Sequence, residues 1–277
     1  MTAPLAYART IGRADFEYIT GLLYDHSGIR LAPGKEALVS SRLDKRIRAL
    51  GLSGYSDYVR LLRQRLDPGE LRHLIDLLTT NETFFFREAQ HFEYLRKHVL
   101  PHRQTGRTFR LWSAASSSGE EAYTAAMVLA DALPAHSWEI VGTDISSRIV
   151  ETARAALYPI AAAEKIPRPL LRQYCLKGRD EYQGLMTVTR ELRAKVRFHC
   201  RNLNHDFREL GKFDVIFLRN VMIYFDLDTK RTLVPRLQEQ LVPGGHLIIG
   251  SSESLSAIPS RLRMVEPSIY RLDDGRA

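Results

Sequence analysis

The chain has 277 residues, of which 44% are hydrophobic and 26% charged, so we expect one substantial core with a smaller domain and exclude the disordered and fibrous classes. Its two cysteines, Cys175 and Cys200, are too few for a disulfide framework or a zinc site, and no apolar run approaches the ~20 residues of a membrane-spanning helix. The opening segment lacks a basic stretch followed by an apolar core, so we expect no secretory signal and a cytoplasmic protein that is not integral to a membrane.

The formal net charge of +8 makes the distribution of basic residues important. They concentrate in residues 42–48, 60–66 and 96–107. A basic face there would suit RNA, anionic lipid or an acidic protein surface, and the alternative is an ordinary solvated helix face. No basic run alternates with aromatic residues as a base-stacking surface would require, so we expect no nucleic-acid partner.

Residues 15–78 are predicted to form a bundle of short helices. Their apolar residues recur at spacings of three and four: Phe16, Ile19, Leu22 and Leu23, then Leu38, Leu43, Ile47 and Leu50. Gly51, Gly54 and the Asp-Pro-Gly sequence at 67–69 interrupt the pattern, as turns do. We therefore expect a helical N-terminal domain at residues 1–80, followed by a linker and first helix at 81–107.

From residue 108 onward, short apolar runs alternate with helical segments. The runs are residues 108–113, 139–144, 196–200, 213–218 and 246–250, and the clearest helices are residues 122–133 and 147–158. This alternation predicts an α/β domain at residues 108–277 with a mainly parallel sheet covered by helices. Two strand-like pieces around Gly184 predict a small β insertion at about 159–195.

The loop at residues 114–121, Ala-Ala-Ser-Ser-Ser-Gly-Glu-Glu, follows the first predicted strand, at the edge of the sheet where α/β proteins bind ligands. Asp144 ends the second strand, where an acidic residue can accept both ribose hydroxyls. The loop has one glycine rather than the three of a dinucleotide site, and Glu120 and Glu121 would repel a phosphate. They suit S-adenosylmethionine, which carries a sulfonium and an ammonium, or they only complement the helix dipole.

Four separated segments resemble, in order, those of the CheR chemoreceptor methyltransferases. They are TNETFFFRE at 80–88, LWSAASSSGEEAY at 111–123, FDVIFLRNVMIYF at 213–225 and LVPGG followed by GSSES within 241–254. Ala122 replaces the usual proline and Leu218 a common cysteine, and neither change removes a group that the chemistry needs.

This resemblance implies a Rossmann-like methyltransferase domain that transfers a methyl group from S-adenosylmethionine to glutamate side chains of methyl-accepting chemotaxis receptors. The products would be glutamyl methyl esters and S-adenosylhomocysteine, no metal would be needed, and the receptor's cytoplasmic domain would be the partner of a monomer. The nucleophile is already ionised at pH 7, because the pKa of a glutamate is ~4.3, so no general base is required. The rivals are an RNA or small-molecule methyltransferase, and a degenerate domain that only senses a ligand.

The resemblance implies cofactor contacts for one set of residues: Asn81, Thr83, Arg87, Glu121, Asp144, Asn202, Leu203, Arg219 and Asn220. It also implies catalytic roles for Arg87, which would orient the incoming carboxylate, and for Tyr224. Simpler alternatives remain: Asn81 as a helix N-cap, Arg87 in a surface ion pair with Glu82 or Glu88, and Asn202 as a turn residue.

A cationic face is expected to dock the acidic helices of a receptor. Arg42, Lys45 and Arg46 lie at positions i, i+3 and i+4 of a predicted helix and so share one side of it. That face is too short to follow a nucleic-acid backbone but long enough for an acidic helix.

Overall fold

The computed structural model describes residues 10–64 and 67–273. The start of the chain, where a secretory signal was sought, and residues 65–66 of one basic stretch lie outside the described residues, as do residues 274–277. The chain forms two compact units. The first contains the residues up to Thr80 together with Tyr224–Asp226, and the second contains Asn81–Ile223 and the residues from Leu227 onward.

The first unit is the predicted helical bundle. Its helices are α1 (Arg13–Ser27), α2 (Glu36–Ala49), α3 (Tyr55–Gln64) and α4 (Pro68–Leu78). They bury the apolar faces expected from the three-and-four spacing, including Ile19 of α1 and Leu43 of α2, both fully buried. Asp67 caps α4 by accepting a hydrogen bond from the backbone amide of Glu70 at 3.2 Å, with a proline in the first turn.

The second unit is built on a seven-stranded sheet in the order β6-β2-β1-β7-β8-β10-β9. The strands are β1 (Phe109–Ser113), β2 (Trp138–Asp144), β6 (Val196–Cys200), β7 (Phe213–Leu218), β8 (Leu241–Ile249), β9 (Leu262–Glu266) and β10 (Ile269–Leu272). The pairs from β6 to β8 are parallel, whereas β10 pairs antiparallel with β8 and β9. The predicted mainly parallel sheet is confirmed, and the antiparallel pair at its end was not predicted.

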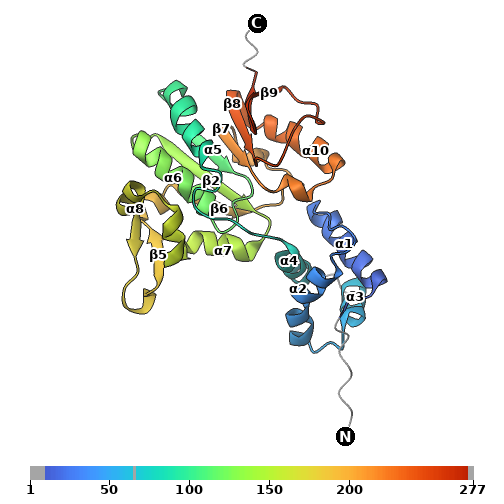
Figure 1. The fold of residues 1–277 in the computed structure, drawn as a ribbon. Helices are drawn as coiled ribbons and strands as arrows, with labels where there is room; N and C mark the ends of the chain where they lie inside the picture. Colours follow the sequence, from blue (N-terminus) through green and yellow to red (C-terminus); the bar gives the residue numbers. More distant parts are fainter. Residues whose placement is uncertain (1–9, 65–66, 274–277) are drawn as a thin grey trace. The chain divides into compact units, whose positions relative to one another are not determined.

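Six α-helices accompany this sheet in the described part of the second unit. They are α5 (Ala89–Tyr94), α6 (Glu120–Ala132), α7 (Ser147–Ala155), α8 (Arg168–Tyr174), α9 (Arg190–Arg193) and α10 (Leu227–Gln238). Figure 1 shows α6 and α7 on one side of the sheet and α10 on the other. This arrangement follows from right-handed strand–helix–strand connections, because the chain moves across the sheet in one direction from β1 to β6 and in the other direction from β7 to β8. The central strands β1 and β2 are almost entirely buried, and β7 is buried along its whole length.

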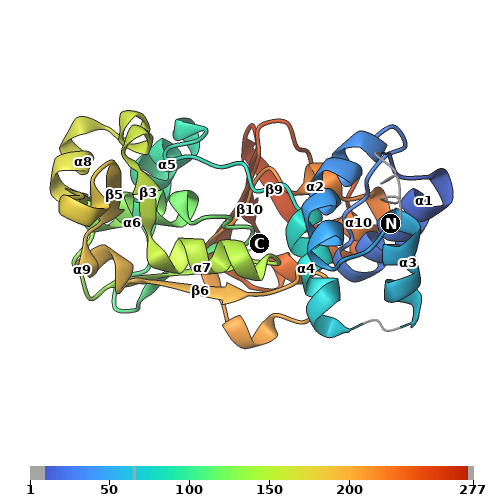
Figure 2. The same ribbon diagram turned by 90° about the horizontal axis from the view of Figure 1, so that it is seen from below.

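A second, three-stranded sheet projects from the domain, in the order β3-β5-β4. It contains β3 (Leu157–Pro159), β4 (Cys175–Lys177) and β5 (Leu185–Val188), all paired antiparallel. Figure 2 shows these strands grouped with α8 and α9.

The order of the large sheet fixes where a ligand binds. The chain moves from β1 to β2 and β6 on one side, and then continues with β7 and β8 on the other. The carboxyl ends of β1 and β7 therefore flank the point at which the strand order reverses, which is where open α/β sheets hold their ligands. The loop after Ser113, the residue Asp144 and the segment after Leu218 all lie at this edge.

Candidate functional site

The loop between β1 and α6 needs its single glycine for two reasons. Gly119 has a φ of +97°, in the left-handed region where a side chain is strained. A Cβ atom there would also lie 3.0 Å from the Ala153 Cβ atom and 3.1 Å from the Tyr158 hydroxyl. The glycine therefore serves the tight turn and close packing rather than the approach of a pyrophosphate.

Asp144 ties this loop together from the end of β2. Its Oδ2 atom accepts a hydrogen bond from the Ser117 amide at 2.9 Å, and its Oδ1 atom accepts one from the Ser146 amide at 3.0 Å. Each carboxylate oxygen has more than one acceptor site, so ribose hydroxyls can still bind. The Ser117 hydroxyl donates to the main-chain oxygen of Asn81 at 2.8 Å. Asn81 thus lies beside the loop, and it caps no helix, because α5 begins only at Ala89.

The two glutamates at the start of α6 have different surroundings. Glu120 is buried and accepts a hydrogen bond from the Ser118 hydroxyl at 2.6 Å. Glu121 accepts one from the Ser113 hydroxyl at 2.7 Å and one from Arg219 Nη1 at 2.9 Å. Burial raises the pKa of both carboxyls, and the charge of Arg219 opposes that rise at Glu121. Glu121 therefore belongs to a buried ion pair and does more than complement a helix dipole.

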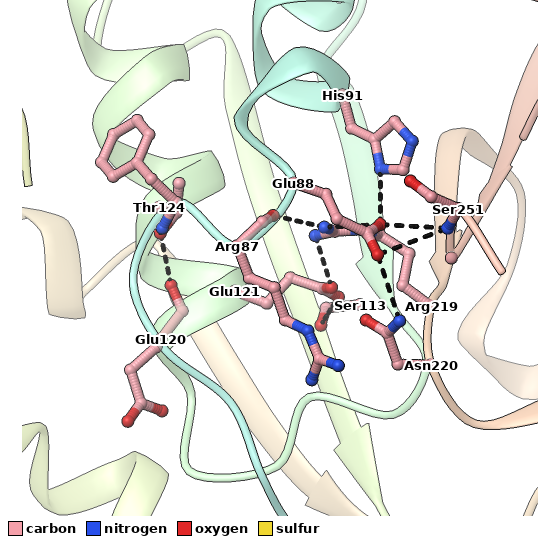
Figure 3. Close-up of polar contacts among 12 residues, drawn as sticks. Arg87, Glu88, His91, Ser113, Glu120, Glu121, Thr124, Arg219, Asn220 and Ser251 are labelled. Atoms are coloured by element: carbon pink, nitrogen blue, oxygen red, sulfur yellow. Dashed lines mark hydrogen bonds and ion pairs between the residues drawn. The ribbon is translucent and has the colours of Figure 1, made fainter. Parts of the chain in front are cut away.

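Arg219 stands at the centre of a buried charge network, drawn in Figure 3. Its side chain is 1% exposed, and its Nη2 atom lies 3.2 Å from Glu88 Oε2. The same nitrogen donates to the main-chain oxygen of Arg87, while Nη1 binds Glu121. The guanidinium also lies over the Phe92 ring, 5.2 Å from its centroid. One guanidinium thus joins two carboxylates and the backbone next to one of them.

Glu88 is held from several directions. Its Oε1 atom accepts a hydrogen bond from the Asn220 amide group at 3.2 Å, and its two oxygens each lie 3.3 Å from the Ser251 backbone nitrogen. Burial favours a raised pKa for Glu88, but the Asn220 hydrogen bond and the Arg219 charge outweigh it and lower the pKa. The residue has a φ of +54°, so this network stabilises a backbone conformation that is uncommon for a residue with a side chain.

Arg87 points away from the network that fixes its own main chain (Figure 3). Its Nη1 atom donates to the main-chain oxygen of Glu82 at 2.7 Å. Within residues 10–64 and 67–273 it forms no ion pair, so the surface pairing with the Glu82 or Glu88 carboxylate is not observed. A half-buried guanidinium that is not paired with a carboxylate can bind an anionic group.

Glu253 is a site residue to which the sequence analysis assigned no role. Its Oε2 atom accepts hydrogen bonds from the backbone amides of Asn220 at 3.0 Å and Gly250 at 2.7 Å, and Oε1 accepts one from Ile223 at 3.2 Å. Asn220 has a φ of +57°, so this carboxylate clamps a tight turn at the end of β7. The only signal was its place in the matched segment GSSES, which does not reveal the contacts.

Four other predicted site residues have surroundings that differ from one another: Thr83, Asn202, Leu203 and Tyr224. Asn202 accepts a hydrogen bond from the Asn204 amide at 2.9 Å, which is the turn role considered above, and Leu203 beside it is 7% exposed. Both follow β6 at the same edge of the sheet, and Thr83 is half-buried in the segment before α5. Tyr224 belongs to the first unit, where its main-chain oxygen accepts a hydrogen bond from the Arg30 amide at 2.8 Å.

The predicted docking cations are not equivalent. Arg42 donates to the main-chain oxygen of Leu78 at 2.7 Å, at the end of α4. Arg46 forms an ion pair with Glu70 at 2.5 Å, and their side chains are 27% and 7% exposed. Lys45 is exposed. The three residues therefore do not form the predicted cationic face together. Arg42 and Arg46 bind α4 inside the bundle, because a long side chain at either position reaches that neighbouring helix. Lys45 extends into solvent.

Two further kinds of protein, a metal-binding protein and one with a membrane-spanning helix, find no support in the part of the chain that the structure describes. Across these residues, histidine, cysteine, aspartate and glutamate side chains do not gather in a group that could hold a metal ion. Nor does any described helix combine the length and apolar composition needed to cross a membrane.

We expect the buried His91 to lower the stability of the folded protein as the pH falls. It is fully buried, with Nδ1 3.3 Å from Glu88 Oε2 and Nε2 2.7 Å from the Ser268 hydroxyl. Burial, helped by the charge of Arg219, lowers the pKa of His91 from 6.5 to about 4. The folded state therefore rejects a proton that the unfolded chain accepts, so the stabilisation is complete above pH 6.5 and is lost as the pH falls toward 4.

Replacing His91 by glutamine, which does not titrate, should reduce the loss of unfolding free energy between pH 7 and pH 4 by about 3 kcal/mol. Urea unfolding at a series of pH values measures this slope, and His136→Gln, at an exposed histidine before β2, is the control. An unchanged slope in the His91 variant would mean that the folded protein accepts the proton at this position.

The strand order, the loop after β1 and the acidic residue that ends β2 together define an S-adenosylmethionine-dependent methyltransferase with a Rossmann-like domain. Family models agree along nearly the whole chain: "CheR methyltransferase, all-alpha domain" matches residues 14–79, and "CheR methyltransferase, SAM binding domain" matches residues 81–271. The chain belongs to the CheR methyltransferase family, as the four segments predicted.

Curated relatives match over similar lengths. A chemotaxis protein methyltransferase of Salmonella typhimurium is 37% identical over 267 residues, which cover 95% of this chain and 92% of that protein. One from Escherichia coli is 38% identical over 262 residues, covering 94% and 91% respectively. Chemotaxis protein methyltransferase 2 of Pseudomonas aeruginosa is 38% identical and covers 93% of this chain and 92% of its own. The predictions of a methyltransferase and of S-adenosylmethionine as its cofactor are confirmed.

Proposed function

We propose that this methyltransferase esterifies glutamate side chains on the cytoplasmic domains of chemotaxis receptors, and that it works in the cytoplasm as a monomer. The observation that carries the proposal is likeness to chemotaxis protein methyltransferases through both the helical and the cofactor-binding domains. We further propose the domain limits expected from the sequence, with the helical domain at 1–80, a linker at 81–107 and the catalytic domain at 108–277, including the insertion at about 159–195.

Several residues would hold the cofactor at the edge of the sheet. Asp144 would accept the ribose hydroxyls, and the carboxylate of Glu121 would face the cationic part of the molecule. Asn81 and Thr83 would line the site from the segment beside the loop, and Asn202 and Leu203 would frame the adenine. When bound, S-adenosylmethionine supplies the electrophilic methyl group.

Arg219 and Asn220 would act on the cofactor indirectly. Both terminal nitrogens of Arg219 already bind Glu88 or Glu121, and the Asn220 amide binds Glu88. A direct contact would have to replace one of these bonds, at a site where an unpaired buried charge is costly. We therefore treat the two residues as supports that orient Glu121 and the turn of Arg87.

The chain's own contribution to the reaction would be orientation and the exclusion of water. The substrate glutamate is ionised at neutral pH, so no residue has to remove a proton. Arg87 would bind its carboxylate in a planar, two-point contact and align an oxygen with the methyl group. The charges of the carboxylate and the sulfonium disappear as the bond forms, so a dry site favours the transition state. That Tyr224 helps to orient the carboxylate remains a prediction.

Methyl transfer can be tested with the full chain, radiolabelled S-adenosylmethionine and receptor-containing membranes. A methyl ester releases volatile methanol when the labelled receptor is treated with base, whereas methylated amines and nucleobases keep their label. Base-labile label on the receptor band is the expected result. Base-stable label on added tRNA, lost at high salt, would instead favour an RNA methyltransferase. Cofactor binding without any transfer would favour a sensing module.

Asp144 should matter for cofactor affinity. Asp144→Ala removes charge-assisted hydrogen bonds to the ribose, each contributing about 1.5–3 kcal/mol, and also frees the Ser117 amide. Calorimetry should therefore show weaker S-adenosylhomocysteine binding, and Asp144→Asn, which keeps one acceptor, should bind with intermediate affinity. Equal affinity in the wild type and both variants would remove Asp144 from the site. The wild type should not bind NAD.

Receptor docking is best tested at Lys45. Reversing Arg42 and Arg46 would break contacts with α4, so their loss would not separate docking from folding. Lys45→Glu should raise the KM for receptor about two- to fivefold, the range of an exposed ion pair, and leave S-adenosylhomocysteine affinity unchanged. The effect should shrink at high salt. Lys35→Glu, at the other end of α2, is the matched control, and an equal effect there would reject a specific role for Lys45.

A further inference from the structure

Phe84 is a large apolar residue left exposed in a segment that is otherwise held firmly. It is 39% exposed, whereas the next residue, Phe85, is fully buried and packs edge-to-face on Tyr158 with ring centroids 5.0 Å apart. The Phe86 amide donates to the Thr124 hydroxyl of α6 at 3.1 Å. A single exposed aromatic side chain is common on protein surfaces. This one is unusual because of the charges beside it.

Two positively charged side chains lie over the Phe84 ring. The Arg87 Cζ atom is 5.9 Å from the ring centroid, and the Lys165 Nζ atom is 5.7 Å from it. Lys165 is exposed and ends a short 3₁₀ helix, η3 (Ile160–Lys165), that follows β3. The face of an aromatic ring attracts cations electrostatically. The ring therefore brings together two cations from segments that are far apart in the sequence.

Neither cation is neutralised by a carboxylate in the described ranges. Arg87 donates only to the main-chain oxygen of Glu82, and Lys165 forms no ion pair or hydrogen bond with any residue of 10–64 or 67–273. Glu82 and Glu164 are exposed, and in this part of the chain their carboxylates pair with neither cation. Two like charges near one ring repel each other, so an anionic partner that binds both is favoured.

From this arrangement we infer that Lys165 is a specificity-determining residue that binds an acidic side chain of the methyl acceptor. It would do so while Arg87 binds the glutamate that is methylated, so the inference rests on the proposed function. Phe84 would be a positioning residue, because its ring holds the two cations beside each other.

The spacing of the two cations suits a helical acceptor. Residues three or four positions apart on a helix lie on the same side, with Cβ atoms about 5–6 Å apart. A helix that presents its target glutamate to Arg87 can therefore present a second acidic residue, one turn away, to Lys165. An acceptor with a neutral residue there would bind less well, so the sequence around a glutamate would help to decide whether it is methylated.

The test is a double-mutant cycle between Lys165 and the acceptor, with the full chain, S-adenosylmethionine and receptor-containing membranes. Mass spectrometry of the wild-type product locates the methylated glutamate, and each acidic residue three or four positions from it is changed to glutamine. Lys165→Ala should raise the KM for receptor about two- to fivefold, the range of an exposed ion pair, and leave kcat nearly unchanged. The acceptor change should raise the KM by the same factor in the wild type and have no further effect in Lys165→Ala.

A charge exchange and a matched control make the cycle specific. Lys165→Glu should raise the KM about tenfold, because repulsion replaces attraction, and an acceptor with lysine at the partner position should reverse most of that increase. Lys195→Ala is the control. The Lys195 Nζ atom also lies over an aromatic ring, 5.9 Å from the Trp138 centroid, but at the amino end of β2, whereas Asp144 ends that strand. Its removal should leave the KM unchanged.

The positioning role of Phe84 has its own variants. Phe84→Leu keeps an apolar side chain but removes the ring face, so it should lower kcat and raise the KM, each about two- to fivefold. Phe84→Tyr keeps the ring face and should restore both values. All these variants should bind S-adenosylhomocysteine as the wild type does, which shows that they fold.

Three results would overturn the inference while the wild type still labels the receptor and the proposed function stands. In the first, Lys165→Ala has no larger effect on the KM than Lys195→Ala. In the second, no acidic residue lies three or four positions from the methylated glutamate. In the third, replacing that residue has its full effect in Lys165→Ala as well. A wild type that never labels the receptor would reject the proposed function and this inference together.

Discussion

Arg219→Met should lower the free energy of unfolding by roughly 3–5 kcal/mol, the cost of leaving buried charge without its partner. The guanidinium is 1% exposed and joins Glu88 to Glu121, so methionine fills much of the space but leaves two carboxylates close together without a cation. Urea unfolding at pH 7 measures the loss. The variant should also bind S-adenosylhomocysteine poorly, since neither Glu121 nor the turn at Arg87 would stay in place.

A second substitution distinguishes uncompensated charge from lost packing. Adding Glu88→Gln to Arg219→Met removes one of the two unpaired carboxylates, so the double variant should be more stable than Arg219→Met alone. Arg219→Lys should fall between the wild type and Arg219→Met, because an ammonium keeps the charge but cannot make the same set of bonds. A double variant less stable than Arg219→Met would show that the charge pairing is not what holds this part of the domain.

Arg87→Ala should lower kcat for receptor methylation about 10- to 150-fold, which corresponds to the loss of charge-assisted hydrogen bonds of about 1.5–3 kcal/mol. The affinity for S-adenosylhomocysteine should change much less, because only the incoming carboxylate needs this guanidinium. Single-turnover kinetics with receptor membranes, together with calorimetry, give the two quantities.

Arg87→Lys should recover little of the activity, since an ammonium lacks the planar geometry that matches a carboxylate. Arg263→Ala, at an exposed arginine of β9, is the control. If cofactor affinity and turnover fell together in Arg87→Ala, Arg87 would be a cofactor ligand rather than the group that orients the substrate.

Much of the fold could be predicted from the sequence because its signals are local. The first-unit helices have regular apolar spacing and clear turn residues, and the five central strands are short apolar runs separated by helical segments. The hairpin β9–β10 gave no such signal. In Leu262–Glu266 only the first residue is buried, so the strand lacks the apolar pattern by which the buried strands are recognised.

For the site, the sequence predicted a set of residues but not the contacts between them. Arg219 lies 98 residues from Glu121 and 131 from Glu88, so no local pattern could reveal that they form one network. The same limit applies to Glu253 and to the docking cations. Arg42 and Arg46 share a helix face with Lys45, and periodicity cannot say which of the three reaches α4. At each of these positions the partner of the side chain is set by tertiary contacts, which the local sequence does not show.

The helical unit is discontinuous in sequence, because it includes Tyr224–Asp226. The Tyr24 hydroxyl donates to Asp226 at 2.6 Å, across 202 residues of chain, and Ile29 forms a β-bridge with Phe225. During synthesis at about 5–20 residues per second, this N-terminal unit must wait at least several seconds before its last segment leaves the ribosome. A fragment that ends at Thr80 would lack that segment, and a helical unit exchanged between two relatives would have to carry both pieces. The domain nearest the N-terminus is thus among the last to be completed.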